Sequence, residues 1–263
     1  AQMKTNVVYL SEASRLMSEL SEGSIDLIYA DPPFGTNNRQ RSGDLSYSDS
    51  FDDYVQFIKE HAAHLQRVLN DSGTAYVHLD YRWVHYAKVE LDLTFGRENF
   101  LGEIVWSYNF GGRGKNFFAK KHDTILVYAK QKGHHVFNYD DIDRIPYKAP
   151  EMQYVGRSRE EAERRIAAGQ VPTDVWDIPI IGTNSRERVG YPTQKPTSLI
   201  RRIVVASSPV GGVVLDPFCG SGTTAIVAAS VGRRFIVCDK SEDAVRVTGE
   251  RLTHAMVQFD TVR

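Results

Sequence analysis

The sequence predicts an α/β fold in which helices cover both faces of a parallel sheet. Apolar strand patterns alternate with amphipathic helical patterns through most of the chain. A glycine-rich turn joins a buried strand to a helix over residues 213–224, and the alternation breaks over residues 131–190 before it resumes. We therefore expect one α/β domain that carries an inserted segment.

The first part of the alternation occupies residues 1–130. Each predicted strand is a short apolar run with polar flanks. These strands cover residues 7–10, 27–30, 74–80, 104–108 and 124–129. Each predicted helix carries apolar side chains on one face, as Tyr54, Phe57, Ile58, His61 and Leu65 do. The helices lie around residues 16–20, from residue 52 to the turn formers at 70–73, and at 83–93.

The second part of the alternation follows residue 190. Helical patterns alternate there with two strand patterns. The helices cover residues 197–208, 221–232 and 241–252, and the strands cover 211–218 and 233–239. Residues 131–190 lack such a period, apart from a charged helix at 158–169, and we interpret them as an inserted subdomain.

Composition and charge are those of an ordinary globular protein. The chain has 263 residues, of which 41% are hydrophobic, and its net charge of −1 argues against a protein that coats nucleic acid indiscriminately. The apolar runs are too short to span a membrane, and no secretion signal is apparent, so we expect a cytoplasmic protein. Cys219 and Cys238 have no metal-ligand spacing and are as consistent with free thiols as with a pair.

One segment is strongly basic. Over residues 111–132 six cations accompany a single acid, Asp123, and the aromatic residues Phe117 and Phe118 lie among them. The cations are Arg113, Lys115, Lys120, Lys121, Lys130 and Lys132. A solvated loop explains this pattern, and so does a loop that contacts phosphates, because local Lys and Arg clusters provide most of the affinity for nucleic acid.

The turn VVLDPFCGSGTT at 213–224 is the strongest cofactor signal. Gly220 and Gly222 allow a ligand to approach the backbone, and the following helix offers unpaired N–H donors. Fifteen residues after Thr224, the strand FIVCD ends in Asp239, an acid placed to accept hydrogen bonds from ribose hydroxyls. A simple strand-to-helix turn is the structural alternative.

Asp216 indicates the class of ligand. A carboxylate inside the turn would repel the pyrophosphate of a dinucleotide but would attract an ammonium group. The glycines do not follow the G-x-G-x-x-G spacing, and no lysine follows them as in a P-loop. We therefore expect a nucleoside with a cationic amino-acid tail, which describes S-adenosylmethionine.

A rigid corner follows the strand at 27–30. Asp31, Pro32, Pro33 and Phe34 end this strand abruptly. Together with residues 216–224, this tetrapeptide resembles the two signature motifs of the S-adenosylmethionine-dependent DNA amino-methyltransferases. The order in this chain, with the catalytic motif first and the cofactor turn last, resembles the β group of that family, whose members often belong to restriction–modification systems.

The resemblance covers nearly the whole chain except residues 131–190. It implies a Rossmann-like methyltransferase sheet that is circularly permuted. On this basis residues 1–130 form the catalytic half, 131–190 the target-recognition region, and 191–263 the cofactor-binding half.

The resemblance also implies a mechanism. The Asp31 side chain and the Pro32 carbonyl accept N–H hydrogen bonds from the exocyclic amine of the target base, so that its nitrogen lone pair points at the sulfonium methyl. The prolines preset this geometry. Phe34 stacks on the extruded base, worth about 1–3 kcal/mol. Base flipping and direct methyl transfer follow, because the target atom is buried in the duplex.

The target expected from the resemblance is adenine N6 in double-stranded DNA. In the β group an Asp at the first position of the tetrapeptide accompanies adenine, whereas Ser accompanies cytosine N4. Cytosine N4 and RNA stay open as alternatives. So does a dinucleotide-dependent Rossmann oxidoreductase, against which Asp216 and the missing third glycine count, and a non-catalytic DNA-binding subunit, against which the intact tetrapeptide counts.

Other positions are site candidates by the same resemblance. The cofactor-binding candidates are Asp216, Pro217, Phe218, Gly220, Ser221, Gly222, Thr223, Thr224, Asp239, Lys195, Thr197 and Glu12. The DNA-binding candidates are Arg113, Lys115, Lys120, Lys121, His122, Arg186 and Arg188. Lys195 and Thr197 lie in a Lys-Pro motif that the family places beside the methionine end of the cofactor, whereas Ser11-Glu12 departs from the family's usual Gly-Asp.

We expect the polar loop at residues 36–50 to cover the flipped base as a lid. A cognate restriction endonuclease is the partner that the resemblance implies, since the chain itself shows no nuclease motif. Relatives are often homodimers, although no residue here indicates one.

Overall fold

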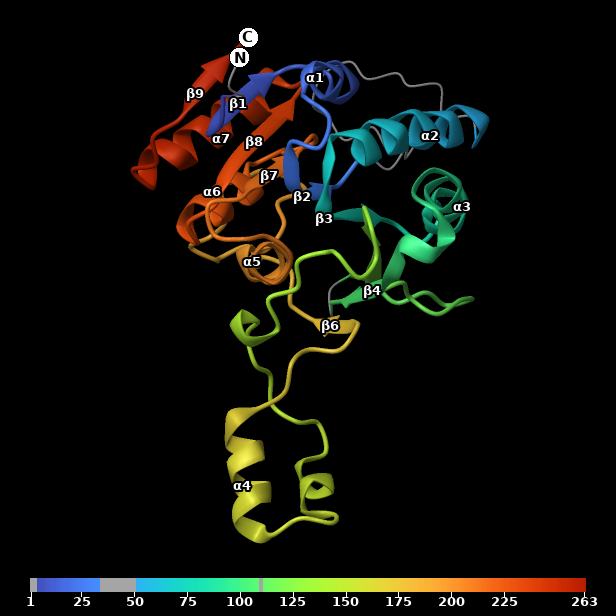
Figure 1. Cartoon of the computed structure of the whole chain (residues 1–263), viewed down its shortest axis with the longest axis vertical. Helices are drawn as coiled ribbons and strands as arrows, with labels where there is room; N and C mark the ends of the chain where they lie inside the picture. The colour runs from blue at the N-terminus through green and yellow to red at the C-terminus, as the bar shows by residue number, and fades with distance from the viewer. Residues whose placement is uncertain (1–3, 34–50, 109–110) are drawn as a thin grey trace.

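The computed structural model describes residues 4–33, 51–108 and 111–263. Phe34 and the expected lid at residues 36–50 lie outside these ranges. Within them the strands form one sheet in the order β6-β4-β5-β3-β2-β7-β8-β1-β9 (Figure 1). The strands are β1 (Val7–Leu10), β2 (Ile25–Ala30), β3 (Leu69–Leu79), β4 (Phe100–Ser107), β5 (His122–Ala129), β6 (Val175–Asp177), β7 (Val213–Asp216), β8 (Arg234–Asp239) and β9 (Asp260–Val262).

The order of the strands joins the two ends of the sequence. β2, near the start of the chain, pairs in parallel with β7, near its end, and Ile28 lies opposite Leu215. β1 pairs in parallel with β8 and β9, so the first and the last strand of the described chain lie side by side (Figure 1). A chain that begins with one half of the sheet and returns to complete it has the circularly permuted arrangement that the sequence predicted.

The prediction of a parallel sheet is correct for every paired strand in the described ranges except β5. This strand runs antiparallel to both β3 and β4. The reason lies in the connection, because the part of it that the structure describes, residues 111–121, holds no helix, and a short connection of this kind joins antiparallel strands. The loop between them therefore emerges at the same edge of the sheet as the end of β3.

Helices cover both faces of the sheet, as predicted. On one face the core is built with α1 (Ala13–Glu19), α2 (Phe51–Val68) and α3 (Val84–Phe95). On the other face it is built with α5 (Thr197–Ser207), α6 (Thr223–Ser230) and α7 (Glu242–His254). Two short 3₁₀ turns lie between elements of the chain: η1 (Arg97–Asn99) joins α3 to β4, and η2 (Tyr139–Asp141) follows β5.

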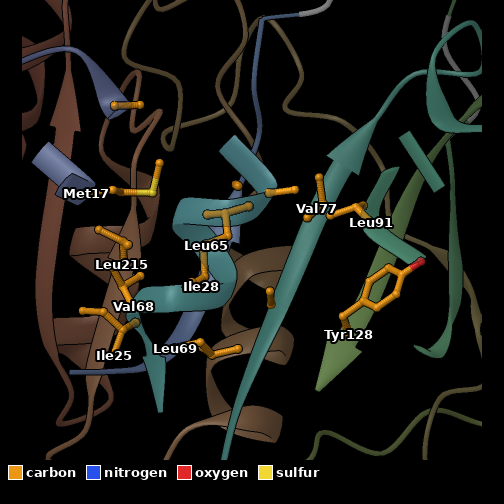
Figure 2. Close-up of a cluster of buried hydrophobic side chains, with 14 of the residues drawn as sticks. Met17, Ile25, Ile28, Leu65, Val68, Leu69, Val77, Leu91, Tyr128 and Leu215 are labelled. Carbon is orange, nitrogen blue, oxygen red and sulfur yellow. The ribbon is translucent and has the colours of Figure 1, made fainter. Parts of the chain in front are cut away.

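The first of these cores has β2 at its centre. Figure 2 shows Ile25 and Ile28 of β2 packed among Leu65 and Val68 of α2 and Leu215 of β7. All five side chains are buried. Because β2 is covered on both faces, its residues 27–30 form a continuous apolar run rather than an alternating one. This packing fixes the position of the Asp31 corner that follows β2.

Residues 131–190 depart from the layered body. The 3₁₀ turn η3 (Pro150–Tyr154) and α4 (Arg159–Ala168) pack on each other and project away from the sheet (Figure 1). Ser158 caps α4, since its side chain accepts a hydrogen bond from the Glu161 N–H. The chain then returns to the body, where β6 pairs in parallel with β4. The helix predicted at 158–169 is thus present, and the segment also contributes an edge strand.

The burial of Ile28 yields a stability prediction. Ile28→Ala removes a fully buried side chain at the β2–β7 contact and leaves a cavity, so we expect the free energy of unfolding to fall by about 2–5 kcal/mol. Urea denaturation followed by circular dichroism measures this change. Val210→Ala is the matched control, because Val210 is 77% exposed and its loss should cost less than about 0.5 kcal/mol. Equal losses in the two variants would contradict the placement of β2.

Candidate active site

Four acidic residues lie at one edge of the sheet. β2, β7, β8 and β1 are consecutive, parallel neighbours. Asp31 follows β2, Asp216 ends β7, Asp239 ends β8, and Glu12 follows β1 by two residues. The carboxyl ends of parallel strands meet at one edge, and this is where open α/β sheets bind their ligands. Residues from the two ends of the sequence therefore form one site.

Asp31 forms a salt bridge within this site. Its Oδ2 atom accepts a hydrogen bond from the Nζ of Lys195, and the two side chains are only 16% and 12% exposed. Lys195 lies just before α5, and its backbone carbonyl accepts a bond of 3.3 Å from the Thr223 hydroxyl at the start of α6. The Lys-Pro segment thus contacts both the Asp31 corner and the glycine turn. Pro32 is buried and Pro33 is exposed.

The glycine turn after β7 has the shape that its glycines permit. Gly220 and Gly222 have φ angles of +49° and +76°, a region that disfavours residues with a Cβ. A Cβ on Gly222 would lie 2.5 Å from the Thr248 side chain, so α7 packs directly on the turn. Arg251 of α7 adds hydrogen bonds to the Ser221 carbonyl, at 2.7 Å, and to the Thr223 hydroxyl, at 3.1 Å.

Asp216 is more enclosed than the sequence suggested. Its carboxylate accepts hydrogen bonds from the Phe218 N–H, at 3.0 Å, and from the Thr224 hydroxyl, at 2.6 Å, and the residue is 3% exposed. Burial raises the pKa of Asp216 to about 7, although these two hydrogen bonds act in the opposite direction. The structure therefore gives Asp216 a part in shaping the turn, which the reasoning about an ammonium partner did not include.

Asp239 and Glu12 lie on the other side of the turn. The Asp239 carboxylate accepts hydrogen bonds from the backbone N–H groups of Gly220, at 3.0 Å, and Ser241, at 2.9 Å. Burial raises the pKa of Asp239, and these backbone hydrogen bonds partly offset the effect. Glu12 is more exposed and lies 3.7 Å from the Nζ of Lys240. Asp239 thus joins the glycine turn to the end of β8.

Three further cofactor candidates have structural partners. Phe218 packs against α2, with ring centroids 6.1 Å from Phe57 and 5.5 Å from His61. The buried Pro217 accepts a hydrogen bond from the Cys238 thiol through its carbonyl. The Thr197 N–H donates to Glu187, which caps the start of α5. Both cysteines are buried and free.

A buried polar chain beside Asp31 escaped the sequence analysis. The Tyr29 hydroxyl lies 2.8 Å from His78 Nδ1, and His78 Nε2 lies 3.0 Å from Asp123. The Tyr108 hydroxyl donates to the same carboxylate at 3.1 Å. Burial would raise the pKa of Asp123, but the contacts with His78, together with Lys195 and Tyr108, hold it below its usual value. The sequence signal was a histidine within the apolar strand TAYVHL.

The basic loop, residues 111–121 between β4 and β5, lies at the same edge of the sheet as Asp31. Lys121 and His122 are half-buried at its end, and Arg113, Lys115 and Lys120 are exposed. The Nζ of Lys120 lies 4.2 Å from the Phe117 ring centroid and 4.9 Å from that of Tyr81, and the Nζ of Lys121 donates to the Gly111 carbonyl. Lys120 and Lys121 thus also stabilise the loop, whereas Arg113 and Lys115 project at its surface.

Arg186 and Arg188 are exposed in the segment before α5. The Gln194 side chain braces this segment through hydrogen bonds to the Glu187 carbonyl, at 2.7 Å, and from the Val189 N–H, at 2.9 Å. Since Lys195 follows directly, both arginines lie in a segment that leads into the Asp31 site. Among the described residues, no group of His, Cys, Asp and Glu is arranged to hold a metal ion. None of the helices in those ranges has the length and apolar character needed to cross a bilayer.

Comparison with known protein families identifies the family of this chain. The sequence model of the DNA methylase family for N6 and N4 methylation matches residues 25–250, which include both the Asp31 corner and the glycine turn. The chain belongs to the DNA methylase family. The resemblance noted from the two motifs is therefore confirmed, and the protein is an enzyme of this family.

Individual relatives agree with this assignment. The chain is 32% identical to the type II methyltransferase M.HpaI of Haemophilus parainfluenzae over 252 residues, which cover 96% of this chain and 76% of that protein. It is 30% identical to the DNA adenine methyltransferase YhdJ of Escherichia coli K12, covering 92% of this chain and 80% of YhdJ.

Solved structures share the fold. The cytosine-N4-specific PvuII DNA methyltransferase matches with a TM-score of 0.69 at 15% identity, covering 99% of this chain and 96% of that one. The complex of M1.HpyAVI with S-adenosylmethionine matches with a TM-score of 0.63 at 20% identity, covering 94% and 98%. These matches confirm the Rossmann-like methyltransferase fold.

The raised pKa of Asp216 predicts a pH-dependent stability difference. The folded protein keeps the Asp216 proton up to about pH 7, whereas the unfolded chain releases it near pH 4, so this group lowers the stability increasingly as the pH rises through that window. Asp216→Asn removes the effect. We expect the melting temperature of the variant, relative to wild type, to increase between pH 5 and pH 7.5 by about 2–4 °C for each kcal/mol of penalty removed.

Differential scanning calorimetry at the two pH values measures this difference. Asp260→Asn serves as the control, because Asp260 forms an exposed ion pair with Lys4. A relative melting temperature of Asp216→Asn that stays constant or decreases with pH would contradict a protonated, buried Asp216.

Proposed function

We propose that this methylase transfers the methyl group of S-adenosylmethionine to the exocyclic N6 amine of adenine in duplex DNA. The observation that carries the proposal is the pairing of β2 with β7, since it brings the Asp31 corner and the glycine turn to adjacent strand ends. An acceptor for the amine and a turn able to hold the methyl donor therefore lie side by side. The two groups that must react would meet at this point.

The residues at the edge fit S-adenosylmethionine by their charge. Asp31, Asp239 and Glu12 make this edge acidic, and no lysine lies within the turn Gly220–Gly222. An acidic edge favours a ligand with a sulfonium and an ammonium over one with phosphates. Asp239, held by two backbone N–H groups at the tip of β8, has the position of a ribose-binding acid. S-Adenosylmethionine supplies the electrophilic methyl group.

Asp31 has the chemical role of accepting and aiming the amine. The salt bridge with Lys195 uses Oδ2, so we assign Oδ1 and the Pro32 carbonyl to the two N–H groups of the amine. A carboxylate only accepts hydrogen bonds, as this role requires. The amine held in this way would form a bond to the methyl carbon as the carbon–sulfur bond breaks with its electron pair on sulfur, and the proton that the nitrogen then loses would pass through its hydrogen bond with Asp31 to solvent.

Adenine is the preferred target for two reasons. An Asp begins the tetrapeptide, and YhdJ, at 30% identity, is named an adenine methyltransferase. Cytosine N4 is the second candidate, because the cytosine-N4-specific PvuII enzyme shares the fold. The basic loop, Arg186 and Arg188 supply cations that could contact the DNA backbone. A cognate restriction endonuclease and a homodimer are partners that we infer from the resemblance alone.

Mass spectrometry of nucleosides tests the reaction. The protein is incubated with S-adenosylmethionine and unmethylated duplex DNA of mixed sequence, and the digested DNA is analysed for modified bases. We expect N6-methyladenine. N4-methylcytosine would support the second candidate, and no methylated base in the presence of bound cofactor would contradict the proposal.

Replacement of Asp31 separates chemistry from cofactor binding. Asp31→Asn keeps the shape of the side chain but makes it a poorer acceptor and breaks the salt bridge with Lys195, so we expect methyl transfer to fall on the order of 100-fold or more. Calorimetric binding of S-adenosylhomocysteine should change by less than about threefold, because the glycine turn is unaltered. Asp260→Asn is the control. Full activity of Asp31→Asn would show that Asp31 does not position the amine.

A further inference from the structure

The loop between β4 and β5 is closed at its neck and anchored beside the site. The Tyr108 N–H donates to the Lys121 carbonyl at 2.8 Å, and the Lys121 ammonium bonds the Gly111 carbonyl. Asp123, two residues further on, lies within the electrostatic influence of Lys195, which pairs with Asp31. The loop therefore begins and ends next to the residues proposed to hold the target base.

Phe117 makes contacts within this loop, although it is 62% exposed. Its ring packs against the backbone of Gly114, where an added Cβ would lie 2.8 Å from the ring, and against the ammonium of Lys120. The same ammonium lies over Tyr81, which follows β3. A chain of Gly114, Phe117, Lys120 and Tyr81 thus ties the loop to the body of the protein. The loop presents its next side chain from a supported backbone.

That next side chain is Phe118, which is 99% exposed. Full exposure of a phenyl ring leaves about 1.5–3 kcal/mol of burial free energy available to a partner that covers it. The surroundings show what kind of surface would cover the ring. Arg113 and Lys115 are exposed in the same loop and favour a partner with negative charge. The Phe118 ring favours a partner that also has an apolar gap.

We propose that Phe118 inserts into the base stack of duplex DNA at the position vacated by the flipped target base. This inference rests on the proposed function, because a base that leaves the helix for Asp31 opens such a gap beside the loop. Apolar side chains inserted between bases offset the lost stacking. Arg113 and Lys115 would bind the flanking phosphates, while the contacts of Lys120 with Phe117 and Tyr81 hold the loop in position.

The effect of Phe118 should depend on whether the target base is paired. Once wild type has been used to map a methylated site, that site is placed in two synthetic duplexes, one fully paired and one with an abasic position opposite the target. Phe118→Ala should lower methyl transfer about tenfold on the paired duplex and less than twofold on the abasic one, because only the first requires base pairs to be broken. Phe118→Leu should retain at least half of wild-type activity on both.

Two readouts distinguish insertion from a structural effect. With 2-aminopurine at the target position, wild type should raise the fluorescence of the paired duplex, and Phe118→Ala should not. The affinity for S-adenosylhomocysteine should be unchanged. Val210→Ala is the control, since Val210 is an exposed apolar residue just before β7, at the opposite edge of the sheet.

The outcomes separate this inference from the proposed function. A wild-type protein that methylates no DNA would overturn both. If wild type is active, a Phe118→Ala variant with wild-type activity on the paired duplex would overturn the insertion alone. Equal losses on the paired and abasic duplexes would also overturn it, because they would indicate a general contact or a misfolded loop.

Discussion

The pairing of β2 with β7 is the constraint on which the rest of the structure depends. It joins the strand that ends at Asp31 to the strand that leads into the glycine turn, although 185 positions separate Asp31 from Asp216 in the sequence. The buried side chains of Ile28 and Leu215 stabilise this contact from one side. Because both strands are parallel, their functional residues emerge at the same edge without any need for long loops.

A site at this edge also requires that the charge of its acidic side chains is controlled. Four carboxylates lie at the ends of neighbouring strands, and each one is stabilised differently. Lys195 pairs with Asp31, a hydroxyl and an amide hold Asp216, two amides hold Asp239, and Lys240 lies near Glu12. The site can therefore keep an acidic character at its surface while the most buried acid, Asp216, retains its proton near neutral pH.

Much of this arrangement could be predicted from the sequence because local patterns determine it. The Asp31 corner and the turn at 220–222 are rigid or glycine-dependent features that short sequences specify, and the family match confirms the identification. The antiparallel β5 was missed because strand direction depends on the connection and not on the strand itself. The turn predicted at 70–73 is wrong, because these residues lie within β3, which begins at Leu69, and they only shift the register of its pairing with β2 between Ile25 and Leu27.

Contacts between distant parts of the chain could not be predicted in this way. Lys195 and Asp31 are 164 residues apart, and nothing in either motif indicates that they pair. The chain from Tyr29 through His78 to Asp123 joins three strands, so it becomes visible only when the sheet order is known. The difference between Phe117, which contacts Gly114 and Lys120, and the fully exposed Phe118 likewise depends on the conformation of the loop.

The most direct test of a shared site at the β2–β7 edge is a crystal structure of the protein with S-adenosylhomocysteine. We expect the ribose to lie near Asp239, the ligand to follow the turn at Gly220–Gly222, and its sulfur to face the Asp31 corner. A ligand bound at another edge of the sheet, or with its sulfur turned away from Asp31, would contradict it.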